Sequence, residues 1–159
     1  MSIIKVLTIG DVVGHEAINY LQNHLYSFQS KNNINLTIAN GENALGMGID
    51  PLSASNIFSA GVDIITSGNH IWKRKEIKQY LDDDYRIIRP CNYRNAPGYG
   101  YTVAKIDETF TQVILNSVSG TAQESADNIL MATLAKMQGV AEDDITVMVT
   151  KVRKNVEAS

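Results

Sequence analysis

Three short apolar runs in the first half of the chain each lead into a glycine and a polar group, and this repeat constrains the fold most. The runs end in Gly10-Asp11, Gly41-Glu42-Asn43 and Gly68-Asn69-His70. Compact apolar runs rich in β-branched residues are typical of buried strands. In an open parallel sheet, ligands bind beyond the carboxyl ends of the strands. The repeat therefore predicts one site assembled from neighbouring strand ends.

The segments between these runs have helical patterns. Residues 16–29 space their apolar side chains three and four apart, at Ile18, Leu21, Leu25 and Phe28, which is typical of an amphipathic helix. A second helix is expected to begin at Pro51 with Asp50 as its N-cap, with an apolar face made of Leu52, Ile57 and Phe58. A third, polar helix is expected over residues 73–81.

This alternation, followed by a fourth short strand over residues 86–89, predicts an α/β fold. We expect a largely parallel sheet with helices on both faces and right-handed crossovers. Further along, residues 101–106 and 111–115 predict a β-hairpin, residues 125–137 a helix and residues 145–152 a last strand. We expect residues 1–120 to form the α/β domain and residues 121–159 to form a helix–strand segment packed on it.

Charge and composition argue against several partners. The 14 basic and 17 acidic residues give a net charge of −3, so a nucleic-acid or anionic-membrane partner is not expected. The sequence contains no apolar run of membrane-spanning length. The first residues lead into a strand and lack the shape of a signal peptide. The single cysteine, Cys91, fits a reducing compartment, so a cytoplasmic location is expected.

The polar groups at the strand ends are suitable metal ligands. Asp11, Glu42, Asn43, Asn69 and His70 offer carboxylate, amide and imidazole donors, which suit Zn, Mn or Fe. The separations are 31 residues from Asp11 to Glu42 and 28 from Glu42 to His70, and each fits one strand–helix unit of about 30 residues. Two metals held by such ligands would polarise a phosphate and supply hydroxide at neutral pH. A nearby imidazole would protonate the leaving oxygen, so the sequence favours phosphoester hydrolysis.

Taken singly, each of these residues has a structural alternative. Asp11 is also a suitable turn or N-cap residue, and Asn43 and Asn69 are suitable for local hydrogen bonds within loops. A lone histidine such as His70 is more often structural than a ligand. Their shared position at successive strand ends is what favours a site.

Several motifs, in order and with matching spacing, resemble the YmdB-like metallophosphoesterases over residues 1 to about 106, and weakly to about 120. The motifs are IGDVVG (9–14), ANGENA (39–44), GVD (61–63), SGNHIW (67–72), RPCNY (89–93) and PGYGY (97–101). The resemblance implies a partial calcineurin-like α/β sandwich and a two-metal site. It also implies hydrolysis of phosphodiesters, with 2′,3′-cyclic nucleotides as the characteristic small-molecule substrates.

The resemblance also assigns roles to the site residues. Asp11, Glu42, Asn43 and Asn69 would be metal ligands, and His70 would be the general acid. The metals would be Fe or Mn, with Zn as a further option. Members of this family draw additional histidine ligands from later strands, whereas this sequence has no histidine after His70. Incomplete metal binding and residual or lost activity are therefore expected.

Two further alternatives concern the rest of the chain. Residues 121–159 resemble either a diverged form of the next helix and strand of the family, or the last helix and strand of sporulation-type Ser/Thr phosphatases. An unfinished sheet would expose an edge strand, which predicts a homo-oligomer formed by edge pairing or segment exchange. The alternative to an enzyme is accordingly a non-catalytic, self-associating α/β domain that retains a relic half-site.

Overall fold

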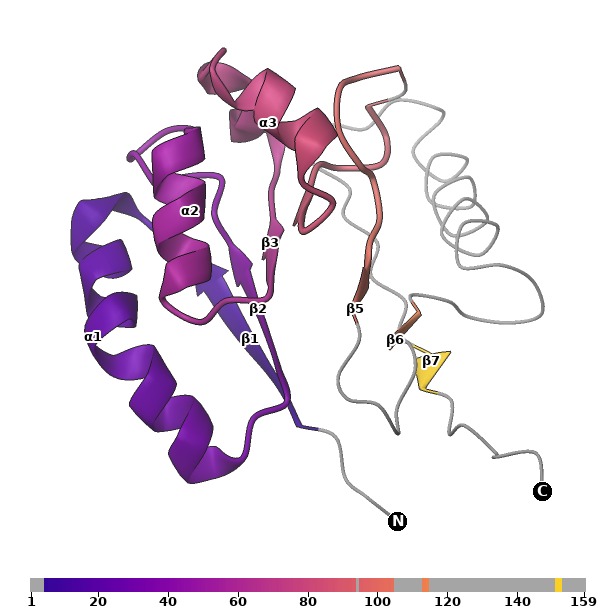
Figure 1. The fold of residues 1–159 in the computed structure, drawn as a ribbon. Coiled ribbons are helices and arrows are strands. Elements are labelled where there is room, and N and C mark those ends of the chain that lie inside the picture. Colours follow the sequence, from indigo (N-terminus) through magenta and orange to yellow (C-terminus); the bar gives the residue numbers. More distant parts are fainter. Residues whose placement is uncertain (1–4, 94, 105–112, 115–150, 153–159) are drawn as a thin grey trace, which may run out of the picture.

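Parallel strands form the central sheet of the chain (Figure 1). They follow one another across the sheet in the order of the sequence: β1 (Val6–Asp11), β2 (Leu36–Asn40), β3 (Ile64–Thr66) and β4 (Ile87–Ile88). The computed structural model describes residues 5–93, 95–104, 113–114 and 151–152. It confirms the predicted α/β class and the largely parallel sheet.

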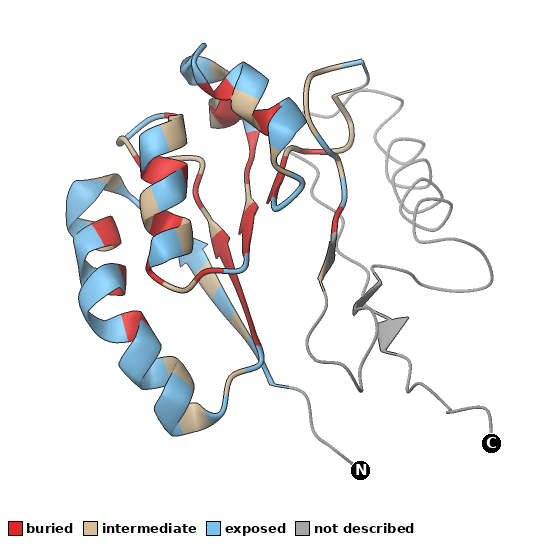
Figure 2. Ribbon diagram, viewed as in Figure 1, coloured by how far each residue is buried: buried red, intermediate tan, exposed pale blue. Residues whose placement is uncertain are grey.

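The described helices pack together on one face of this sheet. They are α1 (Gly14–Asn32), α2 (Pro51–Ser59), the 3₁₀ helix η1 (Asn69–Lys73) and α3 (Ile77–Asp83). Their inward side chains form one core with the strands, and Figure 2 shows these buried positions facing the sheet. The fully buried members of that core include Ile57, Ile65, Ile77, Leu81 and Ile87. No described helix is long and apolar enough to cross a membrane.

In the part of the chain that the structure describes, the opposite face of the sheet meets a strand segment. Leu36, Ile38 and Ile64 are buried there and pack against Ala104 of β5 (Val103–Ala104). β5 pairs antiparallel with β6 (Val113–Ile114), and β6 pairs antiparallel with β7 (Lys151–Val152). This confirms the predicted hairpin. The predicted helix at 125–137 and the boundary at residue 120 lie outside the described residues.

The first two helices form for the reasons that the sequence indicated. Asn33 ends α1 in the left-handed conformation, with φ 53°, which asparagine tolerates better than most residues. Asp50 caps α2 by accepting a hydrogen bond from the Ser53 backbone N–H at 2.7 Å, and Pro51 occupies the first turn. The predicted N-cap is therefore confirmed.

Two residues predicted to lie on buried faces are exposed instead. Phe28 is 50% exposed and Leu52 is 68% exposed. Near the end of α1 the inward position belongs to Gln29, whose side-chain N–H groups donate to Thr37 Oγ1 and the Gly61 carbonyl, both at 2.7 Å. In α2 the inward positions belong to Ser53, Ala54 and Ile57.

The third helix was predicted wrongly over residues 73–81. The chain instead forms η1 directly after β3 and then α3 over Ile77–Asp83. The buried side chains explain this division, because Ile71 anchors η1 while Ile77 and Leu81, four residues apart, anchor α3. The charged residues 73–76 between these anchors are exposed, so no buried side chain joins the two segments into a single helix.

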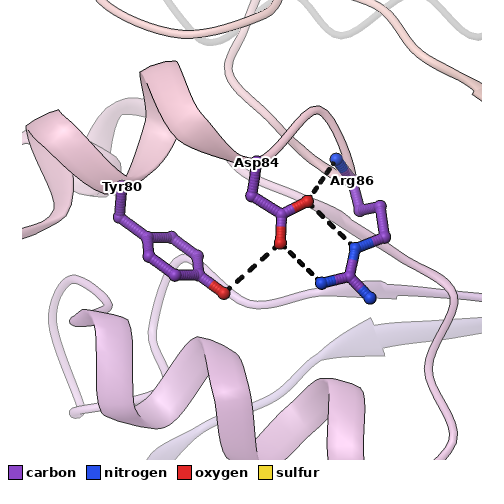
Figure 3. Close-up of polar contacts among 3 residues, drawn as sticks. All are labelled: Tyr80, Asp84 and Arg86. Carbon is purple, nitrogen blue, oxygen red and sulfur yellow. Dashed lines mark hydrogen bonds and ion pairs between the residues drawn. The ribbon is translucent and has the colours of Figure 1, made fainter.

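A small polar cluster connects the end of α3 to the start of β4 (Figure 3). Asp84 accepts hydrogen bonds from Arg86 Nε at 2.9 Å and Arg86 Nη2 at 2.6 Å, and the Tyr80 hydroxyl lies 3.4 Å from Asp84 Oδ2. The Arg86 guanidinium also lies 4.2 Å from the centre of the Phe58 ring of α2. The hydrogen bonds from Arg86 lower the pKa of Asp84 below its ordinary value.

We expect Asp84→Asn to lower the free energy of unfolding by about 1 kcal/mol near pH 7, the usual magnitude for a partly exposed charged hydrogen bond. Because the pKa of Asp84 is lowered in the folded state, its contribution is present above the unfolded pKa of about 3.9 and is lost as pH falls. The difference between parent and variant should therefore shrink towards pH 3. Urea titrations at several pH values measure it, with Asp83→Asn as the control. A pH-independent difference would contradict the ion-pair explanation.

Candidate metal centre

The loops that follow β1, β2 and β3 lie together at the carboxyl ends of the strands. Their backbones are joined directly: the Val12 N–H donates to the Asn40 carbonyl at 2.9 Å, and the Gly41 N–H donates to the Thr66 carbonyl at 2.9 Å. The loop after β2 is therefore held on both sides by its neighbours. This is the edge of the sheet at which the sequence predicted a site.

Hydrogen bonds connect Asp11, Glu42, Asn43 and His70 in this structure. Asn43 Nδ2 donates to Asp11 Oδ2 at 2.8 Å, and His70 Nδ1 lies 2.6 Å from Asn43 Oδ1. The His70 backbone N–H donates to Glu42 Oε2 at 3.1 Å. Asp11 and His70, which are 59 positions apart in the sequence, are thus joined through Asn43.

The fifth predicted residue, Asn69, lies on the same loop as His70. It is exposed and is the first residue of η1. Asp11 is also exposed, whereas Glu42, Asn43 and His70 are half-buried. The side of the cluster that carries Asp11 is therefore more accessible to solvent than the side that carries Glu42 and His70.

The hydrogen bonds of Asn43 determine which imidazole nitrogen of His70 carries a proton. Asn43 must turn its N–H₂ group towards the Asp11 carboxylate, which only accepts. Its carbonyl oxygen then faces His70 Nδ1. Nδ1 is therefore the donor in this pair, and Nε2 is the ring nitrogen that this contact leaves available.

The geometry also explains why a glycine precedes Glu42 at the end of β2. A Cβ atom at Gly41 would lie 2.8 Å from Ile65 Cγ2 and 3.2 Å from Ile49 Cδ1. Only glycine lets the backbone approach β3 this closely. The same approach brings Glu42 within reach of the His70 backbone.

Two further polar groups near these loops were not predicted as functional. Trp72 Nε1 and Asn92 Oδ1 are buried and have no hydrogen-bond partner among the described residues. Trp72 packs edge-on against Tyr93, with ring centres 5.6 Å apart. Asn92 and Tyr93 belong to the RPCNY motif. This motif is the sequence signal that points to Asn92 and Tyr93.

The donors present are suited to a hard divalent cation but do not by themselves complete a site. Asp11 and Glu42 offer carboxylate oxygens, and Asn43 and Asn69 offer amide oxygens, the ligand types that Mn and Fe accept together with imidazole. In the part of the chain that the structure describes, no three His, Cys, Asp or Glu side chains are grouped to hold a metal. These residues therefore fit one side of a metal centre.

The parallel sheet and its helices place the chain among α/β proteins. A crystal structure of a phosphatase from Mycoplasma pneumoniae aligns with a TM-score of 0.65 and 26% identity, covering 86% of this chain and 52% of that one. A hypothetical protein from Thermus thermophilus aligns with a TM-score of 0.60 and 36% identity, covering 65% of this chain and 41% of that one.

A model of the YmdB-like protein family matches residues 7–152, so the chain belongs to this family. The match confirms the resemblance and extends past the last sequence motif. A curated relative, the 2′,3′-cyclic-nucleotide 2′-phosphodiesterase of Bacillus subtilis, is 37% identical over 103 residues, which are 64% of this chain. The matched region spans 39% of that relative.

We expect Gly41→Ala to lower the free energy of unfolding by about 1–3 kcal/mol, the usual cost of overpacking a core, because its methyl group would clash with Ile65. Gly10→Ala is the matched control, since a Cβ atom there would meet nothing within 4 Å. Chemical denaturation of both variants measures the difference. Equal stability of the two variants would contradict the close approach of Gly41 to β3.

Proposed function

We propose that the protein is a metal-dependent phosphoric diester hydrolase. The observation that carries this proposal is the connected set Asp11–Asn43–His70–Glu42 at the carboxyl ends of β1 to β3. It combines anionic metal ligands with an oriented imidazole. The name of the Bacillus subtilis relative, a 2′,3′-cyclic-nucleotide 2′-phosphodiesterase, supports the same class of reaction.

In this proposal Asp11, Glu42, Asn43 and Asn69 hold the divalent ions, which would be Fe or Mn, with Zn as a further option. The bound ions would supply Lewis-acid polarisation of the phosphate. His70 acts as the general acid. Because the Nδ1–H group donates a hydrogen bond to Asn43 Oδ1 at 2.6 Å, Nε2 is the nitrogen from which a proton would pass to the leaving oxygen.

We propose a small nucleotide phosphodiester as the substrate and the cytoplasm as the location. The substrate class rests on the Bacillus subtilis relative, whose name specifies 2′,3′-cyclic nucleotides. The acidic net charge of −3 disfavours a long nucleic acid, because polyanion binding relies on clustered basic residues. The location rests on the single cysteine, Cys91.

A second candidate is a non-catalytic, self-associating α/β domain that keeps part of the site. It is favoured by the lack of a group of three or more ionisable ligands among the described residues. It is also favoured by β1, which lies at the end of the described sheet order and has exposed residues along its length. An open strand edge is a template for pairing with a second copy.

Metal binding and hydrolysis are tested together. We expect Mn²⁺ or Fe²⁺ to raise the melting temperature of the parent chain, with a stabilisation of about 2.7 kcal/mol at 100 times Kd, and to stimulate hydrolysis of a chromogenic bis-phosphodiester. Asp11→Ala and Glu42→Gln should reduce both effects. Isothermal titration and thermal denaturation measure binding independently of activity.

A His70 variant tests the proposed general-acid role separately from metal binding. We expect His70→Ala to retain the metal-induced rise in melting temperature while kcat falls by about 10²- to 10⁴-fold, the usual contribution of a general acid. His24→Ala, on the exposed side of α1, serves as the control. Loss of metal binding in His70→Ala with no separate effect on kcat would contradict the general-acid assignment.

The alternative function makes the opposite predictions. A relic domain should form a dimer in light scattering, show no metal-dependent melting shift and lack hydrolysis with any of the three metals. Thr8→Pro would remove a backbone donor from the edge strand and should then convert the dimer to a monomer. A metal-dependent melting shift accompanied by turnover would exclude this alternative.

A further inference from the structure

A cavity of about 650 Å³ lies at the end of the sheet away from the candidate metal centre. Leu36 and Ile64 line it at the amino-terminal ends of β2 and β3, and Ala104 closes it from β5. The volume falls within the range of small-molecule sites, about 300–1,000 Å³. Because the strands are parallel, none of the residues assigned to the metal centre takes part in this cavity.

Three tyrosines contribute to the wall of the cavity. Tyr85, Tyr99 and Tyr101 line it and are 55%, 43% and 44% exposed, respectively. Tyrosines that are this accessible at a concave surface offer ring faces for stacking and hydroxyl groups for hydrogen bonds. A planar ring is therefore a suitable occupant.

Thr102 supplies the most specific polar group of the cavity. It lines the cavity and is only 5% exposed, yet its Oγ1 atom has no hydrogen-bond partner among the described residues. A buried hydroxyl without a partner is costly, and native proteins pair the great majority of such groups. The atom itself has almost no accessible surface, so a ligand would pair with it once the side chain has rotated about χ1 into the cavity that Thr102 lines.

The charged groups of the cavity favour an uncharged ligand. Arg86 is already neutralised by Asp84, with its Nη2 at 2.6 Å from the carboxylate. Asp63 uses Oδ2 to accept from the Thr37 backbone N–H at 2.7 Å, and no contact with a described residue uses its other oxygen. The available carboxylate oxygen disfavours phosphate groups and favours ligand N–H donors.

We infer that this cavity is a second binding site, for an uncharged planar heteroaromatic ligand that carries N–H donors and has the size of a nucleobase or nucleoside. The ring would lie against the tyrosines, an N–H group would donate to Asp63, and Thr102 Oγ1, turned into the cavity by rotation about χ1, would complete the hydrogen bonding. The inference does not depend on the proposed hydrolase activity, because the two sites lie at opposite ends of the sheet.

Guanosine is the sharpest probe, because its base presents adjacent N–H donors to a carboxylate. We expect isothermal titration of the metal-free chain to show guanosine binding with a Kd below about 1 mM, or about −4 kcal/mol. Guanosine 5′-monophosphate should bind more weakly than guanosine. Adenosine, cytidine and uridine are titrated in parallel. Binding of the monophosphate in preference to every nucleoside, or binding of no nucleoside, would overturn the inference.

Thr102→Val tests the contact that defines the site while preserving the shape of the side chain. Because the hydroxyl has no described partner, the variant should melt at or above the parent temperature, while its guanosine Kd should rise by about fivefold or more, the effect of one lost hydrogen bond. A lower melting temperature with an unchanged Kd would show that the hydroxyl has a structural role and would overturn the inference.

Tyr85→Ala and Tyr20→Ala form a matched pair of exposed tyrosine variants. Tyr85 lines the cavity, whereas Tyr20 lies on α1, outside the cavity, and is 65% exposed. We expect only Tyr85→Ala to weaken guanosine binding, by about fivefold or more, from loss of a stacked aromatic contact. Equal Kd values in the two variants would place the nucleoside elsewhere and contradict the inference.

Discussion

The approach of Gly41 to Ile65 is the contact on which the candidate site depends. It places the loop after β2 so close to β3 that no side chain fits between them. The Gly41 N–H then reaches the Thr66 carbonyl, and the Glu42 carboxylate reaches the backbone of His70. An apolar packing constraint within the core thus determines where the polar groups at the surface can meet.

Asn43 gives the cluster its internal order. A carboxylate in its place could not donate to Asp11, and an aliphatic residue could not accept from His70. The Asn43 amide does both. Because its N–H₂ group faces the Asp11 carboxylate of β1, its oxygen faces His70 and the imidazole proton lies on Nδ1. The metal ligand assigned by resemblance is, in this structure, also the group that orients the proposed acid. Both proposed roles would use the Oδ1 atom of Asn43, which already contacts His70 Nδ1 in this structure.

The two ends of the sheet differ in chemistry because of strand direction. At the carboxyl ends, short turns bring acidic, amide and imidazole groups together. At the amino ends, the cavity beside β5 combines tyrosines with the unpartnered hydroxyl of Thr102. The Tyr80–Asp84–Arg86 cluster stands beside this second end and connects α3 to β4, while Arg86 covers Phe58 of α2. A single parallel sheet therefore carries a polar cluster at one end and a tyrosine-lined cavity at the other.

The sequence by itself determined the alternation of strands and helices, the N-cap at Asp50 and the clustering of Asp11, Glu42, Asn43 and His70. These features depend on local periodicity and on the common direction of parallel strands, which a sequence displays directly. Only the tertiary structure decided that Phe28 and Leu52 face solvent, that η1 and α3 are separate and that Asn43 lies between Asp11 and His70. Those outcomes depend on which neighbouring side chain occupies a shared space, and residues far apart in the sequence compete for that space only once the chain has folded.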